Sequence, residues 1–296
     1  MEDEYLAALT SAGTTRGNPL IARVDGELRI RRKSKPAHPR SEPLGLNHSL
    51  LSDTRLSGIE YRGIERCRSE LQGWRTYYLD PRVSMRRATP PAEVTDIGVL
   101  GENIAPFLYR LQAENSKAFE SIVQVMQSII PGVEGLTVDL DTRRGTIDVM
   151  VRHNGVDFPV RVISEGTLRA LALCSLVVNP WSGALVAIEE PENGVHPRRL
   201  ELIGEMLTSF ALQARRQVLV TTHSPLFCDV VLAKARQLET SEIGLFVTRQ
   251  TAQGTEIRPF ETMGPLFDEA SIRQALSAVG EDGLMMGLML RGMLDG

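Results

Sequence analysis

Lysine is scarce in this chain, and the positions of the few lysines rule out one phosphate-binding motif. The 296 residues include four lysines, Lys33, Lys35, Lys117 and Lys234. None ends a Gly-x-x-x-x-Gly-Lys-Ser/Thr sequence, in which backbone N–H groups and the lysine side chain hold the phosphates of a nucleotide. The sequence as it stands therefore contains no P-loop.

Cysteine, long apolar runs and net charge are also limited. Cys67, Cys174 and Cys228 are scattered and form no Cys/His pair at metal-ligand spacing, which argues against zinc and for thiols in a reducing cytosol. No apolar run approaches the roughly eighteen residues of a membrane span, and the acidic residues 2–4 are unlike a secretory leader. A net charge of −4 gives no overall attraction to nucleic acid. We expect a cytoplasmic protein without a membrane partner.

The most informative segment is residues 184–197, Ala-Leu-Val-Ala-Ile-Glu-Glu-Pro-Glu-Asn-Gly-Val-His-Pro. The apolar run 185–188 is typical of a strand buried on both faces of a parallel sheet. Glu189 and Glu190 follow at its carboxyl end, where such sheets bind ligands. One carboxylate can hold Mg²⁺ while the next orients or deprotonates an attacking water, which is what nucleotide hydrolysis needs. The simpler alternative is a buried strand that ends in a charged turn.

Two further motifs accompany this acidic strand. Residues 164–167, Ser-Glu-Gly-Thr, precede an apolar helical segment, and the apolar strand 217–220 runs into Thr-Thr-His-Ser-Pro at 221–225. The order of signature turn, acidic strand and histidine-bearing strand resembles the second half of an ATP-binding-cassette ATPase head. It is most similar to the RecF- and OLD-type AAA ATPases, relatives of the SMC proteins. The resemblance extends over about residues 75 to 260.

We expect the strands at 185–188 and 217–220 to be adjacent and parallel, because short right-handed crossovers join neighbouring strands, and this places Glu190 and His223 at one edge of the sheet. The resemblance implies roles for the residues at these two strand ends. Glu189 would be the Mg²⁺ ligand of the Walker B motif, and Glu190 the general base or water-orienting group. His223 would hydrogen-bond the γ-phosphate of ATP. The alternative for His223 is an ordinary loop histidine.

The signature turn would contact a second nucleotide. Ser164, Glu165, Gly166 and Thr167 begin a helix, and a helix N-terminus suits a phosphate, which in this superfamily belongs to ATP held by the other subunit. The carboxylate of Glu165 would repel a triphosphate unless it points away. Asn193 and His196 lie in the loop that crosses the dimer interface in relatives, and His196 is equally well explained as a structural residue.

The fold class expected from these patterns is α/β. It combines a P-loop NTPase-like core with a parallel sheet, a small helical subdomain and an antiparallel β meander. Helical spacing of apolar residues follows Asn103 and continues through residues 116–130, and alternation of period two extends from residue 136 to 162. The segment 24–30 suggests a hairpin, and 33–47 a loop.

Four regions follow from this interpretation. Residues 1–75 form an irregular segment or β-arm, residues 76–163 the helical subdomain and meander, residues 164–262 the ATPase core, and residues 263–296 a helical tail. The expected site thus lies in the third region.

The function implied is an ATP-gated dimer that hydrolyses ATP with Mg²⁺, in DNA repair or phage defence. The partner would be a second copy or a P-loop-bearing chain, with DNA as a further candidate. Because relatives place the P-loop near their amino terminus, this chain resembles a member lacking its first stretch, and alone we expect it to be weakly active or inactive. The alternatives are a truncated or non-catalytic chain that supplies signature and Walker B in trans, and a nucleic-acid-binding module that uses Arg82, Arg86 and Arg87.

Overall fold

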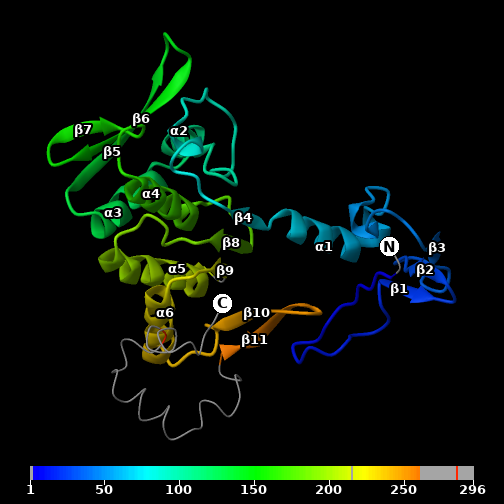
Figure 1. Ribbon diagram of the computed structural model, residues 1–296. Helices are drawn as coiled ribbons and strands as arrows, with labels where there is room; N and C mark the ends of the chain where they lie inside the picture. The colour runs from blue at the N-terminus through cyan, green and yellow to red at the C-terminus, as the bar shows by residue number, and fades with distance from the viewer. Residues whose placement is uncertain (1–2, 215, 261–284, 286–296) are drawn as a thin grey trace, which may run out of the picture. The chain divides into compact units, whose positions relative to one another are not determined.

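A computed structural model describes residues 3–214, 216–260 and 285 (Figure 1). The chain divides into two compact units, Met1–Trp74 and Arg75–Gly296, and each is described by itself. Apart from Met285, the expected helical tail at 263–296 lies outside the described residues.

The first unit combines a small antiparallel sheet with one helix. Strands β1 (Ile21–Val24) and β2 (Glu27–Ile30) form the expected hairpin, because Asp25 and Gly26 both adopt the positive φ that a tight two-residue turn requires. The expected loop at 33–47 is partly wrong, since strand β3 (Arg40–Pro43) pairs with β2. Helix α1 (Arg62–Gln72) completes the unit. The core of this unit contains six buried apolar side chains: Ile21, Leu28, Ile30, Leu50, Leu56 and Ile64.

The second unit contains the three motifs. Its helices are α2 (Ile104–Glu114), α3 (Ser116–Ile129), α4 (Glu165–Val178), α5 (Leu200–Ala214) and α6 (Pro225–Gln237). Its strands are β4 (Arg75–Tyr77), β5 (Val133–Asp141), β6 (Thr146–His153), β7 (Val156–Pro159), β8 (Leu185–Glu189), β9 (Gln217–Thr221), β10 (Phe246–Thr251) and β11 (Gly254–Pro259). No helix among the described residues is long and apolar enough to cross a membrane.

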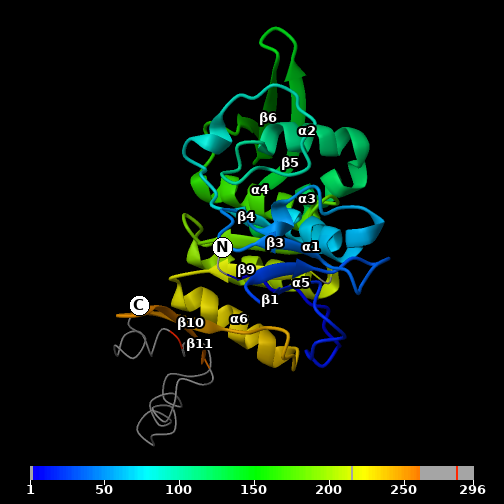
Figure 2. The same ribbon diagram turned by 90° about the vertical axis from the view of Figure 1, so that its right-hand side faces the viewer.

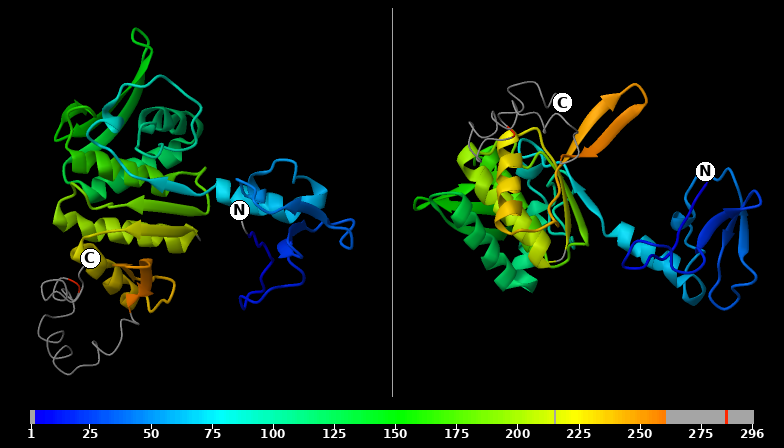
Figure 3. Two further views of the ribbon diagram at one scale, coloured as in Figure 1. Left: turned by 45° about the vertical axis from the view of Figure 1, so that its right-hand side comes forward. Right: turned by 90° about the horizontal axis from the view of Figure 1, so that it is seen from below.

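A parallel sheet of order β4–β8–β9 carries the acidic strand in its centre. The register pairs Val186 with Val218 and Glu189 with Thr221, so the two strands end side by side, as the sequence predicts. Figure 3 shows α5 and α6 on one side of these strands. The predicted α/β class with a parallel sheet is confirmed.

The two faces of this sheet differ, which corrects the expectation of burial on both. Side chains alternate across a strand, and paired residues share a face. Val186 and Ile188 are 1% exposed, on the face that packs into the core. On the opposite face Leu219 is 58% exposed and Leu185 is only half-buried. The apolar run is therefore covered on one side only by the described residues.

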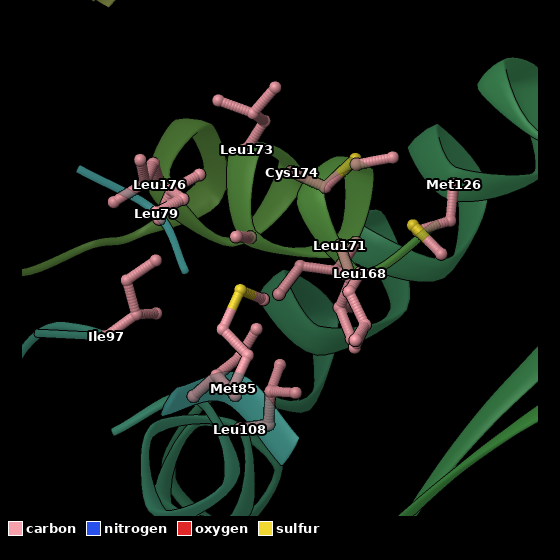
Figure 4. Close-up of a cluster of buried hydrophobic side chains, with 14 of the residues drawn as sticks. Leu79, Met85, Ile97, Leu108, Met126, Leu168, Leu171, Leu173, Cys174 and Leu176 are labelled. Atoms are coloured by element: carbon pink, nitrogen blue, oxygen red, sulfur yellow. The ribbon is translucent and has the colours of Figure 1, made fainter. Parts of the chain in front are cut away.

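The helical subdomain and the meander also have the predicted form. Antiparallel strands β5, β6 and β7 follow one another, with Asn154 and Gly155 at positive φ in the β6–β7 turn. The β5–β6 hairpin extends past the neighbouring helices in Figure 2. Apolar side chains from α2, α3, α4 and the segment before α2 share one core, part of which Figure 4 shows. Leu168 and Leu171 of α4 lie in it beside Met85 and Leu108. This core anchors the helix that starts at the signature turn.

Candidate functional site

Glu190 and His223 meet at the carboxyl end of the parallel sheet. Glu190 directly follows β8, and His223 lies two residues beyond β9. The Glu190 Oε1 is 3.6 Å from His223 Nε2, and Glu190 Oε2 accepts a hydrogen bond of 3.3 Å from the backbone N–H of His223. The predicted placement of the two residues at one sheet edge is confirmed, because adjacent parallel strands end together. Their catalytic roles stay predictions.

The backbone at Glu190 is held in an unusual conformation. Its φ is +46°, a region that residues other than glycine rarely occupy and that is often found at functional sites. The N–H of Glu190 donates to the carbonyl of Thr221, and its carbonyl accepts from the N–H of Asn193 at 3.1 Å. These bonds on both sides of the residue fix the direction of its side chain toward His223.

A second carboxylate changes the electrostatics of this site. Burial and the neighbouring carboxylate of Glu192 raise the pKa of Glu190, while His223 opposes this shift. Thr222 donates its hydroxyl to Glu192 Oε1, and the other oxygen of Glu192 is buried without a hydrogen-bond partner. A carboxylate with a raised pKa is a stronger base than an ordinary glutamate, which suits proton abstraction. Glu192 and Thr222 were missed in the sequence, although both lie inside the quoted motifs.

Ser224 positions the histidine loop. Its hydroxyl accepts from the N–H of Phe227 and caps α6, and Pro225 follows at the first helical position. The Ser224 N–H donates to the hydroxyl of Thr222. The chain is thereby turned so that the His223 side chain points outward, with 93% of it exposed. This histidine is accessible to a ligand above the sheet edge.

Glu189 offers a carboxylate close to that edge. It ends β8 on the uncovered face of the sheet and is exposed. No group of three or more His, Cys, Asp or Glu that could hold a metal occurs among the described residues. Mg²⁺ at nucleotides is commonly bound by one or two carboxylates together with phosphates and waters. The donors present fit a metal held mainly by a nucleotide.

The signature turn begins α4 as the motif predicts. Ser164 is the N-cap, and its hydroxyl accepts from the N–H of Thr167. Glu165 is drawn aside by an ion pair with Arg82, with 3.0 Å between Arg82 Nε and Glu165 Oε1. The negative charge that would repel a phosphate is therefore paired. The first N–H groups of a helix have no partner inside it, so this end can accept an anion.

The loop after Glu190 packs on the same helix end. Gly166 approaches this loop so closely that a Cβ at residue 166 would collide with the carbonyl oxygen of Gly194. Asn193 is exposed in the loop. His196 accepts a hydrogen bond from Arg198 N–H through Nδ1 and so caps a short 3₁₀ turn, which supplies a structural explanation for it. Glycine at 166 is thus required by contact within one chain.

Two arginines connect the motifs, a role that the sequence reasoning assigned to neither. Arg169 is 7% exposed and donates to the carbonyls of Leu79 (3.2 Å) and Glu190 (3.4 Å), while burial lowers its pKa. Arg86 donates to the carbonyls of Pro81, Val160, Arg161 and Ile163, the last three in the segment that leads to Ser164.

Sequence signals for these arginines exist but are weak. Arg169 is the single charged residue in the apolar run 168–178, which could have marked it as buried and partnered. Arg82 and Arg86 have partners within the chain, because the former pairs with Glu165 and the latter donates to main-chain carbonyls. The nucleic-acid alternative stays a prediction.

Comparison with known proteins assigns the family. The profile of a family described as "AAA domain, putative AbiEii toxin, Type IV TA system" matches residues 16–229. The chain belongs to this AAA-domain family. Membership supports an ATPase-type function. A search of curated proteins finds no match.

Solved SMC structures are distantly similar to the chain. A structure titled for ATP-driven dimerization and DNA-stimulated activation of SMC ATPases shares 11% identity at a TM-score of 0.40, over 59% of this chain and 96% of that one. An SMC head domain from Thermotoga maritima shares 13% identity at a TM-score of 0.35, over 86% and 79%. A Pyrococcus furiosus Smc head bound to the C-terminal domain of ScpA shares 12% at 0.35, over 75% of this chain and 47% of its own length.

Proposed function

We propose that the chain provides the acidic-strand and signature parts of an ATP-hydrolysing site that works in an ATP-gated dimer. The observation that carries the proposal is the contact between Glu190 and His223 at the end of a parallel sheet. Membership of an AAA-domain family supports it. The P-loop, which the sequence lacks, would come from polypeptide outside this sequence or from a partner chain.

Glu190 is proposed as the general base. Its raised pKa and fixed backbone prepare it to orient a water and to accept its proton. The proton would move to Glu190 Oε1, and His223 Nε2 beside it would hydrogen-bond the terminal phosphate of ATP. Positioning of this kind matters most in phosphoryl transfer, where the protein does little covalent chemistry.

Glu189 is proposed as the carboxylate that holds Mg²⁺. When bound, Mg²⁺ would neutralise charge that develops on the phosphate oxygens. The exposed carboxylate beside Glu190 would orient the metal through its water shell and so separate the two functions between neighbouring residues. Glu189→Gln should therefore weaken the binding of Mg²⁺, whereas Glu190→Gln should remove the base and leave Glu189 to hold Mg²⁺.

The signature turn is proposed to bind the ATP of a second subunit. Ser164, Gly166 and Thr167 present a helix N-terminus, and Arg82 holds the charge of Glu165 to one side. The loop containing Asn193 and His196 rests against this turn in the same chain. Closure of two subunits around two nucleotides would therefore involve both motifs at once.

The uncovered sheet face supports completion by further polypeptide. Parallel sheets are normally covered on both faces, yet Leu219 is 58% exposed here. Strand β9 is also the last strand of the sheet in the part of the chain that the structure describes. A P-loop strand added beside β9 would bring its lysine to the edge where Glu189 and Glu190 lie.

We place the protein in the cytoplasm, in DNA repair or phage defence, with DNA as a candidate partner. A non-catalytic chain that lends these motifs to another ATPase is the second proposal.

Phosphate release tests the catalytic assignment. The chain alone should bind ATP weakly and turn it over near background, because charge neutralisation by the P-loop lysine is missing. With a P-loop supplied by upstream in-frame polypeptide or a neighbouring chain, Mg²⁺-dependent turnover should appear. Glu190→Gln should then lower it about 10²–10⁴-fold, the usual contribution of a general base. Glu201→Gln, an exposed carboxylate on α5, is the matched control and should retain turnover.

Size-exclusion chromatography of the same proteins with ATP and Mg²⁺ tests whether ATP controls dimer formation. Glu190→Gln should accumulate as a dimer, because nucleotide binds but is not consumed. Ser164→Arg should remain a monomer, since bulk at the helix N-terminus denies the phosphate its amide donors. Glu190-dependent turnover by the chain alone would contradict the need for a P-loop, and full activity of both variants would contradict the assigned roles.

A further inference from the structure

A basic cleft in the first unit is independent of the carboxylate site. The cleft has a volume of about 280 Å³ and is bounded by the chain before β1, the segment after β2 and the start of α1. Its polar lining contains four cations, Arg31, Arg32, Lys33 and Arg62, against one carboxylate, Glu60. This concentration of one charge in a concave site favours an anion.

The charges of these four cations are not neutralised within the described residues. Arg32 donates through Nε and Nη2 to the carbonyl of His38, which fixes its position without cancelling its charge. Arg31 lies beside the side-chain amide of Asn18, an uncharged group. Lys33 and Arg62 are exposed. Across the part of the chain that the structure describes, none of the four forms an ion pair with a carboxylate.

Glu60 offsets only part of this positive charge, because it is a single carboxylate against four cations. Its Oε2 accepts the N–H of Ser34 at 3.2 Å, so the carboxylate is turned toward the main chain. Hydrogen bonding to Ser34, with smaller contributions from the charges of Arg32 and Lys35, lowers the pKa of Glu60. The carboxylate is thus used in holding the basic segment in place.

The surrounding sequence extends the positive charge beyond the cleft. Residues 28–41 include six cations, Arg29, Arg31, Arg32, Lys33, Lys35 and Arg40, and no acidic residue. Arg29 and Arg40 form ion pairs with Asp25 and Glu42, so the four cations at 31–35 carry the excess positive charge. Residues 1–74 contain twelve Lys and Arg against ten Asp and Glu, a net charge of +2, whereas residues 75–296 carry −6. A run of cations in the loop between β2 and β3 matches an elongated polyanion better than a single small anion.

The apolar wall of the cleft adds a second property. Ile59 is 65% exposed at its rim, and Tyr61 and Pro36 also line it. Single-stranded nucleic acids are bound where a positive groove follows the phosphates and aromatic or apolar surfaces receive bases. A chain made of acidic residues alone would offer this wall no base or other flat apolar group.

We propose that this basic cleft binds the sugar–phosphate backbone of a nucleic-acid strand, with phosphates at Lys33 and Arg62 and a base or sugar against Ile59 and Tyr61. The site differs from the proposed ATPase centre, so its binding requires neither ATP nor a P-loop. Each phosphate contact to a single strand contributes a salt dependence of about −0.7 in log K against log salt.

Fluorescence anisotropy of the full chain with a labelled single-stranded oligonucleotide of about twenty nucleotides tests the proposal. The measurement is repeated between about 50 and 200 mM salt. The variant Lys33→Ala/Arg62→Ala should weaken binding about tenfold or more. It should also reduce the magnitude of the slope of log K against log salt by about 1.4, the value for two lost phosphate contacts. The control Arg16→Ala/Arg66→Ala removes two exposed arginines outside the cleft lining and should retain most of the affinity.

Three further measurements decide between outcomes. Lys33→Arg/Arg62→Lys keeps both charges and should bind within about twofold of the original chain, which separates loss of contact from misfolding. Polyglutamate and inorganic phosphate should compete poorly. Absence of oligonucleotide binding at low salt, equal weakening by the two alanine pairs, or competition by polyglutamate as strong as by unlabelled oligonucleotide would each overturn the proposal.

Discussion

Both faces of the β4–β8–β9 sheet carry apolar side chains, but in opposite surroundings, and the open face also carries the polar residues Glu189, Gln217 and Thr221. Val186 and Ile188 face the core with 1% exposure, whereas Leu219 on the other face is 58% exposed. On the covered side, α4 and α5 pack over apolar residues and deliver Arg169 to the turn at Glu190. The difference shows which part of the site this chain builds by itself: the support beneath the carboxylates, and not a layer above them.

The largest expected effect separates the two faces directly. Ile188→Ala removes a fully buried side chain and should lower the free energy of unfolding by about 2–5 kcal/mol, since a cavity remains. Leu219→Ala removes an exposed one and should change it by less than about 0.5 kcal/mol. Urea denaturation of both variants measures this. Equal losses would mean that the open face is covered in solution.

The next effect tests whether the covered side holds the site turn. Arg169→Leu leaves the carbonyls of Leu79 and Glu190 without this donor, and should cost about 1–3 kcal/mol of unfolding free energy. Arg87→Leu is the control, because Arg87 is exposed, and should stay within about 0.5 kcal/mol. Urea denaturation again provides the measurement. A stable Arg169→Leu variant would show that the turn at Glu190 does not depend on α4.

The smallest effect concerns the boundary between the faces, where β8 ends in carboxylates. The pKa of Glu190 in the folded state is raised above its ordinary value of 4.5. The protonated carboxyl therefore stabilises the folded state at low pH, and this stabilisation is lost as pH rises through the folded-state pKa. Glu190→Gln should therefore stabilise the chain at pH 7 by a few tenths to about 1 kcal/mol, and the gain should disappear near pH 4. Glu189→Gln, at an exposed carboxylate, should show no such difference. A destabilised Glu190→Gln at pH 7 would contradict the electrostatic account.

Local patterns were sufficient to predict much of the fold. The run 185–188 and its carboxylates, the period of two in 136–162 and the capping serines Ser164 and Ser224 are properties of short segments. Their conformations follow from side-chain alternation and from hydrogen bonds between near neighbours. The adjacency of Glu190 and His223 followed from the same patterns, because neighbouring parallel strands end at one edge.

Contacts between residues distant in sequence could not be predicted from such patterns. Arg82 pairs with Glu165, and Arg169 reaches Leu79, across more than eighty residues of chain. Arg86 was considered as a nucleic-acid ligand, and its donors go to carbonyls at 160–163. An arginine carries the same charge in every setting, so its burial and partners depend on which elements pack around it.

By itself the sequence determined the order of the three motifs, the helix start at Ser164 and the edge at which the carboxylates and histidine lie, because each depends on periodicity or on neighbours within a few residues. Only the tertiary structure decided that the parallel sheet has one covered face, that Arg169 connects α4 to Glu190, and that Glu192 raises the pKa of Glu190. Those properties arise from burial, and burial depends on packing between elements that no single segment specifies.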